Sequence, residues 1–230
     1  MSELLGNSAY FGVVITVAAF LIGLWCKRKF RIAVCNPLLI AVALVMLALP
    51  ALDVEYAAYQ EGAKYISYLL TPATVCLAIP LYQQLTLLRR NLAAVALGIL
   101  SGVFASMAGV LGLSVIFGLT HEQYVTLLPK SITTAIGMGI SEEMGGVVTI
   151  TVAVIIVTGI LGNIIAGAVC RLFRIEEPIA KGLAIGTAAH AIGTARALEM
   201  GAVEGAMSSL AIAVAGLLTA CTASLFGMMW

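Results

Sequence analysis

The sequence predicts an all-α polytopic membrane protein with about seven or eight transmembrane segments, some of them broken or re-entrant. Of its 230 residues, 62% are hydrophobic and 10% are charged, and the mean hydropathy is +1.10. A typical soluble domain is about half apolar and about a quarter charged. This composition therefore excludes a soluble enzyme, a nucleic-acid-binding protein and a disordered chain. The apolar stretches are as long as membrane helices, whereas barrel strands span only about ten residues.

Four apolar stretches follow one another in the first half of the chain, each longer than the ~20 residues that cross the hydrocarbon core. They are residues 4–26, 32–52, 65–88 and 91–120. Basic clusters lie between them at 27–31 and 89–90, and an acidic stretch lies at 53–61. Because basic loops remain in the cytoplasm, we expect both clusters inside and the N-terminus and the acidic stretch outside.

The second half of the chain is less regular. Two further spans are predicted, at residues 144–170 and 205–230. Residues 123–143 contain Pro129, Lys130 and two glutamates, which favours a re-entrant hairpin with its tip at 128–131. Residues 179–200 are rich in small and polar residues and are predicted to be a second interrupted element. Irregular backbone at membrane depth is tolerated only beside protein or a water-filled cavity, so we expect an internal polar site.

We expect a single integral membrane domain over residues 1–230, because no linker or soluble segment interrupts the chain. Small-residue interruptions at 71–74 and 187–190 would run in opposite directions in this topology, which is typical of inverted-repeat transporters. Residues 1–120 and 121–230 are then candidate repeat halves. The alternative is that the two interruptions are unrelated.

The first candidate site surrounds Pro129, which fits a helix start. A helix beginning near residue 131 would direct free N–H groups and a partial positive charge at the break. Lys130 adds a full positive charge, and the hydroxyl groups of Ser131, Thr133 and Thr134 add donors. Together they predict a binding site for a carboxylate anion. The alternative is that Lys130 only reaches the membrane interface and Pro129 ends a loop.

The second candidate site is a set of polar side chains in an apolar context. These substrate-binding candidates are Thr187, His190, Thr194 and Arg196. His190 is also a candidate proton carrier, because histidine titrates nearest to physiological pH; the alternative is a structural histidine. Arg196 alternatively forms an ion pair with Glu199, three residues further along a helix. The other candidates for proton coupling are Glu142, Glu143 and Glu204.

Other motifs bear on further polar breaks, on helix packing and on the class of protein. Thr71 and Thr74 are expected to form a third polar break that faces the other two, and Asn36-Pro37 is either a polar group or a helix-start turn. Three GxxxG spacings predict close helix contacts, at Gly98/Gly102, Gly182/Gly186 and Gly201/Gly205.

The chain has no GxxxxGK[ST] loop, which excludes a self-contained ATP-driven pump. No metal-ligand spacing or catalytic nucleophile motif occurs, so we expect neither a cofactor nor an enzyme.

Four motifs carry a family resemblance. They are NPLL at 36–39, TPATVCLAIPLYQQL at 71–85, LLPKSITTAIGMGIS at 127–141 and GTAAHAIGTARALEMGAVEGAMSSLA at 186–211. With them the chain resembles the LrgB/CidB family of bacterial inner-membrane proteins, which implies holin-like or antiholin-like control of murein hydrolase activity and autolysis. The family is also similar to the carboxyl-terminal half of the plastid glycolate/glycerate translocator, and related pairs are linked to pyruvate uptake. Ala135 departs from the proline found in one family member, which puts the hairpin geometry in question.

These observations favour a secondary transporter of a small monocarboxylate such as pyruvate, glycolate or glycerate, with proton coupling. The rival interpretation is a holin-like or antiholin-like membrane oligomer, which needs only plain apolar helices and no Lys/His/Arg-bearing breaks. The resemblance implies a small LrgA/CidA-type membrane protein as partner. We also expect a homo-oligomer and no nucleic-acid partner.

Overall fold

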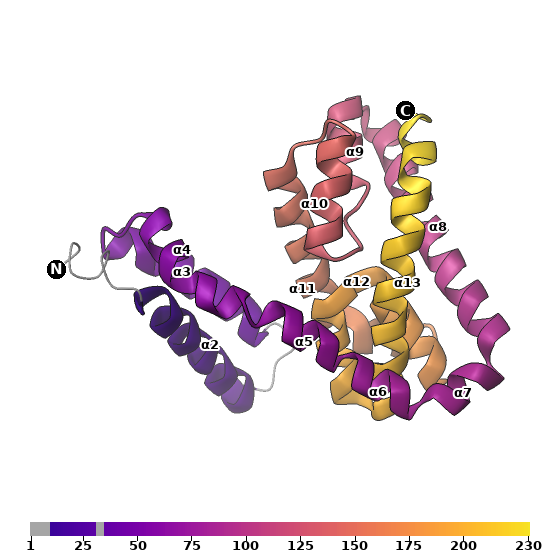
Figure 1. Ribbon diagram of the computed structural model, residues 1–230, viewed down its shortest axis with the longest axis horizontal. Coiled ribbons are helices and arrows are strands. Elements are labelled where there is room, and N and C mark those ends of the chain that lie inside the picture. The colour runs from indigo at the N-terminus through magenta and orange to yellow at the C-terminus, as the bar shows by residue number, and fades with distance from the viewer. Residues whose placement is uncertain (1–9, 31–34) are drawn as a thin grey trace. The chain divides into compact units, whose positions relative to one another are not determined.

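The computed structural model describes residues 10–30 and 35–230; the side chains of Leu70, Thr71 and Thr74 also lie outside the described part. All regular secondary structure in the described part is helical, as the sequence predicts (Figure 1). The chain divides into two compact units, one ending at Cys76 and the other beginning at Leu77, and each is described by itself.

The described part of the first unit contains four helices. They are α2 (Phe11–Phe30), α3 (Pro37–Ala51), α4 (Tyr56–Ser67) and α5 (Leu70–Cys76). Helix α2 packs against α3 and α4. Helix α3 begins at Asn36, whose Oδ1 accepts a hydrogen bond from the Leu38 N–H at 2.8 Å. This cap satisfies a donor that the helix start leaves free, so the helix-start interpretation of Asn36-Pro37 is confirmed.

The second unit contains the remaining helices. They are α6 (Ala78–Gln83), α7 (Leu85–Arg90), α8 (Leu92–Phe117), α9 (His121–Leu127), α10 (Thr134–Glu143), α11 (Val148–Leu172), α12 (Pro178–Met200) and α13 (Ala202–Gly227). Among the described residues, four helices are long and apolar enough to cross a membrane, namely α2, α8, α11 and α13. The predicted spans at 91–120, 144–170 and 205–230 correspond to the last three of these helices.

The span predicted over residues 65–88 is interrupted, but not at residues 71–74, which lie within α5. The structure instead has the end of α4 followed by the three short helices α5, α6 and α7. Two of the interruptions lie one turn before Pro72 and Pro80. Proline has no N–H and its ring clashes with the carbonyl group four residues back, so each proline interrupts the helix that leads to it.

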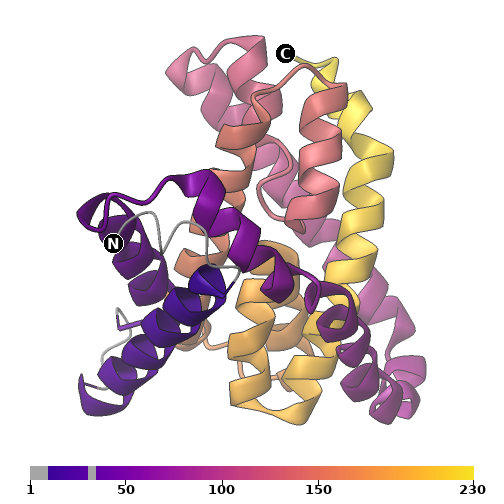
Figure 2. The same ribbon diagram turned by 60° about the vertical axis from the view of Figure 1, so that its left-hand side comes forward.

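The second unit has two distinct ends, as Figures 1 and 2 show. At the C-terminal end, Trp230 Nε1 donates to the Leu119 carbonyl oxygen at 2.9 Å, so the chain terminus lies beside the turn between α8 and α9. The opposite end carries Arg89 and Arg90 of α7 and Arg171 of α11, and we call it the basic end. Helices α9 and α10 lie toward the C-terminal end, and α12 lies toward the basic end.

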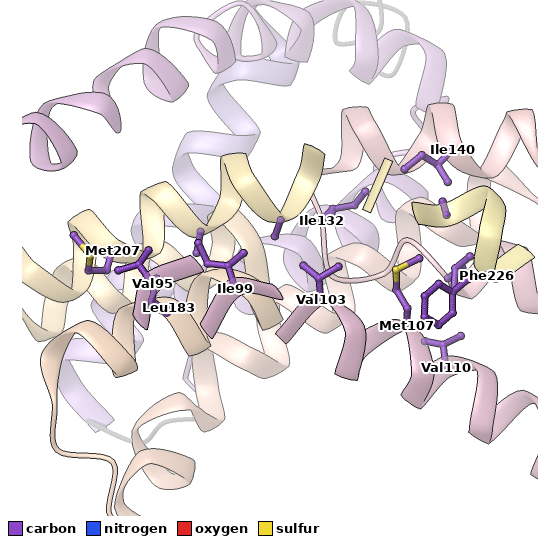
Figure 3. Packing of buried hydrophobic residues seen from close by; sticks show 14 of the residues in the cluster. Val95, Ile99, Val103, Met107, Val110, Ile132, Ile140, Leu183, Met207 and Phe226 are labelled. Atoms are coloured by element: carbon purple, nitrogen blue, oxygen red, sulfur yellow. The ribbon is translucent and has the colours of Figure 1, made fainter. Parts of the chain in front are cut away.

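A row of apolar side chains along α8 forms the main core (Figure 3). These residues are Val95, Ile99, Val103, Met107 and Val110, and all are buried. They recur every three or four residues and therefore share one helix face. They pack against α13 through Met207 and Phe226, and Ile132 joins the same cluster from the segment between α9 and α10. The core thus joins α8 and α13 to the region where α9 ends and α10 begins.

Glycines bring α12 close to two of its long neighbours, α13 and α8. A Cβ atom on Gly182 would lie 2.4 Å from the Glu204 carbonyl oxygen, and one on Gly186 would lie 2.5 Å from that of Ser208, so both glycines touch the backbone of α13. On the other side, a Cβ atom on Gly102 would lie 2.9 Å from Thr187 Oγ1. The contacts predicted from the GxxxG spacings are therefore present within one chain.

Candidate functional site

Helices α9 and α10 form a hairpin that enters from the C-terminal end and turns at residues 128–133. A capping box between Thr120 and Gln123 starts α9. The turn is closed by hydrogen bonds from Lys130 N to the Leu127 carbonyl oxygen at 3.1 Å and from Ile132 N to that of Pro129 at 3.4 Å. The predicted re-entrant tip is thus found, although α10 begins at Thr134 rather than near residue 131, because these turn bonds hold residues 130–132 out of the helix.

A buried hydroxyl cluster attaches this hairpin to α11. Thr151 Oγ1 lies 2.9 Å from the Thr126 carbonyl oxygen and 2.7 Å from Ser141 Oγ, so one side chain of α11 contacts both arms. The Thr126 hydroxyl in turn accepts a hydrogen bond from Val147 N at 2.8 Å. The cluster satisfies polar groups that would be costly to bury alone, and it fixes the depth of the hairpin.

Helix α12 is also a hairpin, because its backbone leaves the helical conformation at two consecutive residues. Ala189 has φ −132° and ψ 15°, and His190 has φ 41° and ψ −141°. The first arm rises from the basic end, and the second arm returns to it before α13 begins (Figures 1 and 2). The interruption predicted within residues 179–200 is therefore present.

Side-chain bonds stabilise the break in α12. His190 Nε2 donates to the Ile155 carbonyl oxygen of α11 at 3.0 Å. The Thr194 hydroxyl lies 2.9 Å from the His190 carbonyl oxygen and 2.7 Å from Ser208 Oγ of α13. Asn163 of α11 donates to the Ile192 carbonyl oxygen at 2.8 Å. These hydrogen bonds satisfy backbone carbonyl groups at the break and in the second arm of α12. The side chain of His190 is therefore directed at α11, and that of Thr194 at α13.

The tips of the two hairpins meet beside α8. Lys130 Nζ donates to Ser131 Oγ at 3.0 Å and to Ser106 Oγ at 3.4 Å, and the two serine oxygens are 3.0 Å apart. Lys130 and Ser131 line the same cavity as Thr187 and Ala188 near the tip of α12. The first arm of α12 ends there, and the partial negative charge of its last carbonyl groups favours a nearby cation.

Lys130 is half-buried, and no carboxylate of the described residues lies within ion-pair distance of it. A lysine ammonium has three N–H donors, of which two are directed at Ser131 and Ser106. The third is therefore available to a ligand. Removing an ammonium from water is costly unless a counter-charge compensates, so this position favours a bound anion.

A cavity of about 800 Å³ connects this position with the basic end. Its lining includes Asn91 and Glu177 at the basic end, and Ser106, Lys130 and Thr187 at the inner end. From Asn91 to Ser106 the cavity follows α8 for about 22 Å, at 1.5 Å per residue. The walls between are mainly small and apolar, and Ala94, Gly98 and Ala105 are examples. The cavity can therefore admit a small solute and presents it with few polar groups except at the tips.

Other predicted site residues lie elsewhere. Thr133 is the residue before α10, and Glu142 and Glu143 are exposed at the end of that helix. Arg196 pairs with Glu199 at 2.7 Å, as its alternative interpretation predicts. The cavity is not lined by four of the predicted residues, namely Thr134, His190, Thr194 and Arg196. Glu204 lines a separate pocket at the basic end. The side chains of Thr71 and Thr74 lie outside the described residues. The structure thus brings together Lys130, Ser131 and Thr187 from the predicted set.

Ser106 is the polar residue that sequence reasoning missed. It lies in the apolar run of α8, where a single serine is unremarkable, and no neighbouring charge marks it. Its spacing from Gly102, one helical turn earlier, was the available signal, because both residues share the face of α8 that contacts α12 and the tip.

Fold and site together define a multi-pass helical membrane protein in which two opposed helical hairpins meet at a lysine. The LrgB-like family model matches residues 16–229, and the chain belongs to this family. It is 37% identical to the holin-like protein CidB of Staphylococcus epidermidis over 86% of both chains. It is 36% identical to the antiholin-like protein LrgB of Bacillus mycoides over 94% of this chain and 95% of the relative. No solved structure matches the chain.

Proposed function

We propose that this chain is a holin-like or antiholin-like membrane protein whose molecular activity is the transport of a small monocarboxylate. The two parts of this proposal have different support. The relatives are named as holin-like and antiholin-like proteins, which favours that role, and their names do not mention transport. Transport is supported by the geometry of the cavity and its lysine.

The observation that carries the transport proposal is the position of Lys130. Its ammonium has no carboxylate partner among the described residues, it lies where two interrupted helices meet, and a cavity reaches it from the basic end. Discontinuous helices that meet inside a membrane protein are typical of substrate sites in secondary transporters. A protein that only opens lesions in the bilayer needs no such group.

The chemistry of the tips favours a small carboxylate as substrate. The free N–H of Lys130 would donate to one carboxylate oxygen, and the Ser106 and Ser131 hydroxyls would bind the other oxygen or a neighbouring keto or hydroxyl group. Pyruvate, glycolate and glycerate all present such a pair of groups. No enzymatic step is part of this proposal.

We place the protein in the bacterial cytoplasmic membrane with its basic end toward the cytoplasm, because arginines gather at that end. The cavity would then open to the cytoplasm, and the N-terminus would lie outside. A homo-oligomer and a small LrgA/CidA-type membrane protein are the proposed partners.

Proton coupling remains part of the proposal, with His190, Glu142, Glu143 and Glu204 as the candidate carriers. His190 is the second of the two residues that form the break of α12, so a change in its protonation would alter the bond to the Ile155 carbonyl oxygen that stabilises the tip. Because symport requires that proton and substrate binding favour each other, a residue at this tip is suitably placed.

Proteoliposomes that contain this chain alone test the proposal. We expect saturable uptake of labelled pyruvate, glycolate or glycerate that an inward proton gradient stimulates, without release of a trapped fluorescent dye. Dye release without saturable uptake would contradict transport and support the formation of membrane lesions. If neither uptake nor release occurs, the test is repeated with the LrgA-type partner co-reconstituted, and a negative result there also contradicts transport.

A further inference from the structure

A second pocket, separate from the cavity at Lys130, lies at the basic end where α11 ends and α12 begins. Its volume is about 420 Å³, and its charged lining consists of Arg171, Arg174, Lys181, Glu176 and Glu204. No carboxylate of the described part of the chain lies within ion-pair distance of any of the three cations. Arg171 Nε donates to the Gly167 carbonyl oxygen of its own helix at 3.2 Å. Three neighbouring cations without a carboxylate partner favour an anionic ligand with several oxygen atoms.

The two glutamates that line the pocket do not neutralise its cations. Glu204 is buried in the first turn of α13, and its Oε2 would lie 2.3 Å from a Cβ atom on Gly201. The carboxylate therefore lies over the start of its own helix, where the partial positive charge of the helix favours it. Glu176 is exposed to solvent. Neither glutamate forms an ion pair with Arg171, Arg174 or Lys181 among the described residues.

Arg174 occupies a backbone position that favours glycine. It has φ 52°, its N–H donates to the Arg171 carbonyl oxygen at 3.2 Å, and the Ile175 N–H donates to that of Cys170 at 2.8 Å. This pair of bonds is the Schellman ending of a helix, in which the left-handed residue is usually glycine. An arginine at this position therefore lowers the stability of the fold. Binding of an anion in the pocket would explain why an arginine is present there despite this cost.

The surroundings favour a lipid as the source of the anion. Leu172 and Phe173, between the two arginines in sequence, are 77% and 69% exposed. Leu172 ends and Phe173 follows an apolar helix long enough to cross a membrane, so in a bilayer the two side chains would lie near the boundary between acyl chains and headgroups. Basic pockets between the ends of membrane helices are suited to lipid phosphates. We propose that this pocket binds the phosphate headgroup of an anionic phospholipid, independently of any transported substrate.

The test uses the full chain purified in a non-ionic detergent. Its melting temperature is measured against short-chain phosphatidylglycerol, phosphatidylcholine of the same chain length, and inorganic phosphate. We expect phosphatidylglycerol alone to raise the melting temperature in a saturable manner. An equal effect of phosphatidylcholine would overturn the requirement for an anion, and an equal effect of inorganic phosphate would overturn the lipid as its source.

Two matched double variants locate the binding site. Arg171→Gln/Arg174→Gln removes two cations of the pocket, and Arg89→Gln/Arg90→Gln removes two cations of the same end that do not line it. We expect the first to weaken the apparent affinity for phosphatidylglycerol by about tenfold or more, because each charge-assisted hydrogen bond contributes about one power of ten. The second should leave it nearly unchanged. Equal effects of the two variants would overturn the pocket.

The variant Arg174→Gly distinguishes a loss of lipid binding from a loss of protein stability. It can also replace the double variant in the test if that variant does not fold. Glycine adopts the positive φ without strain, so the variant should melt at a higher temperature than the wild type without lipid. Its stabilisation by phosphatidylglycerol should be smaller, because one cation is lost. An undiminished lipid-induced shift in this variant would contradict the proposal.

Discussion

At the scale of single residues, Lys130 and its two serine partners form the proposed substrate site. The ammonium is half-buried, donates to Ser131 and Ser106, and has no carboxylate partner among the residues described. Sequence reasoning identified Lys130 and Ser131, since a lysine between apolar runs is conspicuous. It could not identify Ser106, because that role depends on which face of α8 meets the hairpin tip.

Replacing Lys130 tests the anion site. Lys130→Ala should lower uptake by at least about tenfold, since a charged hydrogen bond to the substrate is lost. Lys130→Arg should restore only part of it, because a planar guanidinium presents different geometry to a carboxylate. Lys64→Ala, at a lysine paired with Glu61 on an exposed helix face, is the control and should transport normally. Wild-type uptake by Lys130→Ala would show that the lysine is not part of the site.

Replacing His190 tests its proposed role in coupling. In His190→Gln the side-chain amide can still donate to the Ile155 carbonyl oxygen, so the protein should remain folded and inserted. Because glutamine does not titrate, the dependence of uptake on an inward proton gradient should become flatter, and binding at low pH should weaken. The pH profile of uptake is the measurement. An unchanged profile would leave His190 with a structural role and transfer coupling to one of the glutamates.

At the scale of elements, the two hairpins enter the second unit from opposite ends, and different interactions stabilise them. The α9–α10 hairpin depends on the hydroxyl cluster around Thr151, and the α12 hairpin depends on glycine contacts with α8 and α13. The sequence predicted both interruptions, because proline, glycine and polar residues are visible locally. It gave the pairing of Arg196 with Glu199 only as the alternative to substrate binding, and the structure decides for this ion pair, since packing sets the direction of the return arm.

Gly102 controls the distance between α8 and α12. A Cβ atom there would lie 2.9 Å from Thr187 Oγ1, whereas one on Gly109 of the same helix would meet nothing within 4 Å. Gly102→Ala should therefore separate the helices, lower the melting temperature in detergent and reduce uptake. Gly109→Ala is the matched control and should be neutral or slightly stabilising, because alanine favours the helix by roughly 1 kcal/mol. Equal melting temperatures for the two variants would contradict this contact.

Thr151 stabilises the α9–α10 hairpin. Thr151→Val keeps the shape of the side chain but leaves the Thr126 carbonyl oxygen and the Ser141 hydroxyl without this partner. The expected loss is about 1–3 kcal/mol in the free energy of unfolding, measured by denaturant titration. Thr149→Val, at an exposed position on the same helix, should cost much less.

At the scale of the whole molecule, the ends of the second unit differ in charge. Arginines of α7 and α11 mark one end, and the chain terminus lies at the other beside the start of α9. Basic loops remain in the cytoplasm, so the arginine-bearing end should face inward.

Cysteine labelling with a membrane-impermeant reagent in intact cells tests this orientation. In a background without the five native cysteines, Lys29→Cys and Arg90→Cys should remain unlabelled until the membrane is opened, and Glu122→Cys should be labelled directly. Labelling of position 29 from outside would reverse the proposed topology.

The sequence by itself determined the membrane class of the protein, its long apolar helices, its two interruptions and its family, because composition, proline, charge and motif are properties of neighbouring residues. Over residues 65–88 it predicted a break at 71–74, whereas two of the interruptions in the structure lie about one turn before Pro72 and Pro80. Only the tertiary structure decided that residues 178–200 turn back at His190, that both tips meet at Lys130, and that Ser106 joins them. Those arrangements depend on which helix faces the glycines and the α8 core bring into contact, and contacts between distant segments are not encoded in any local pattern.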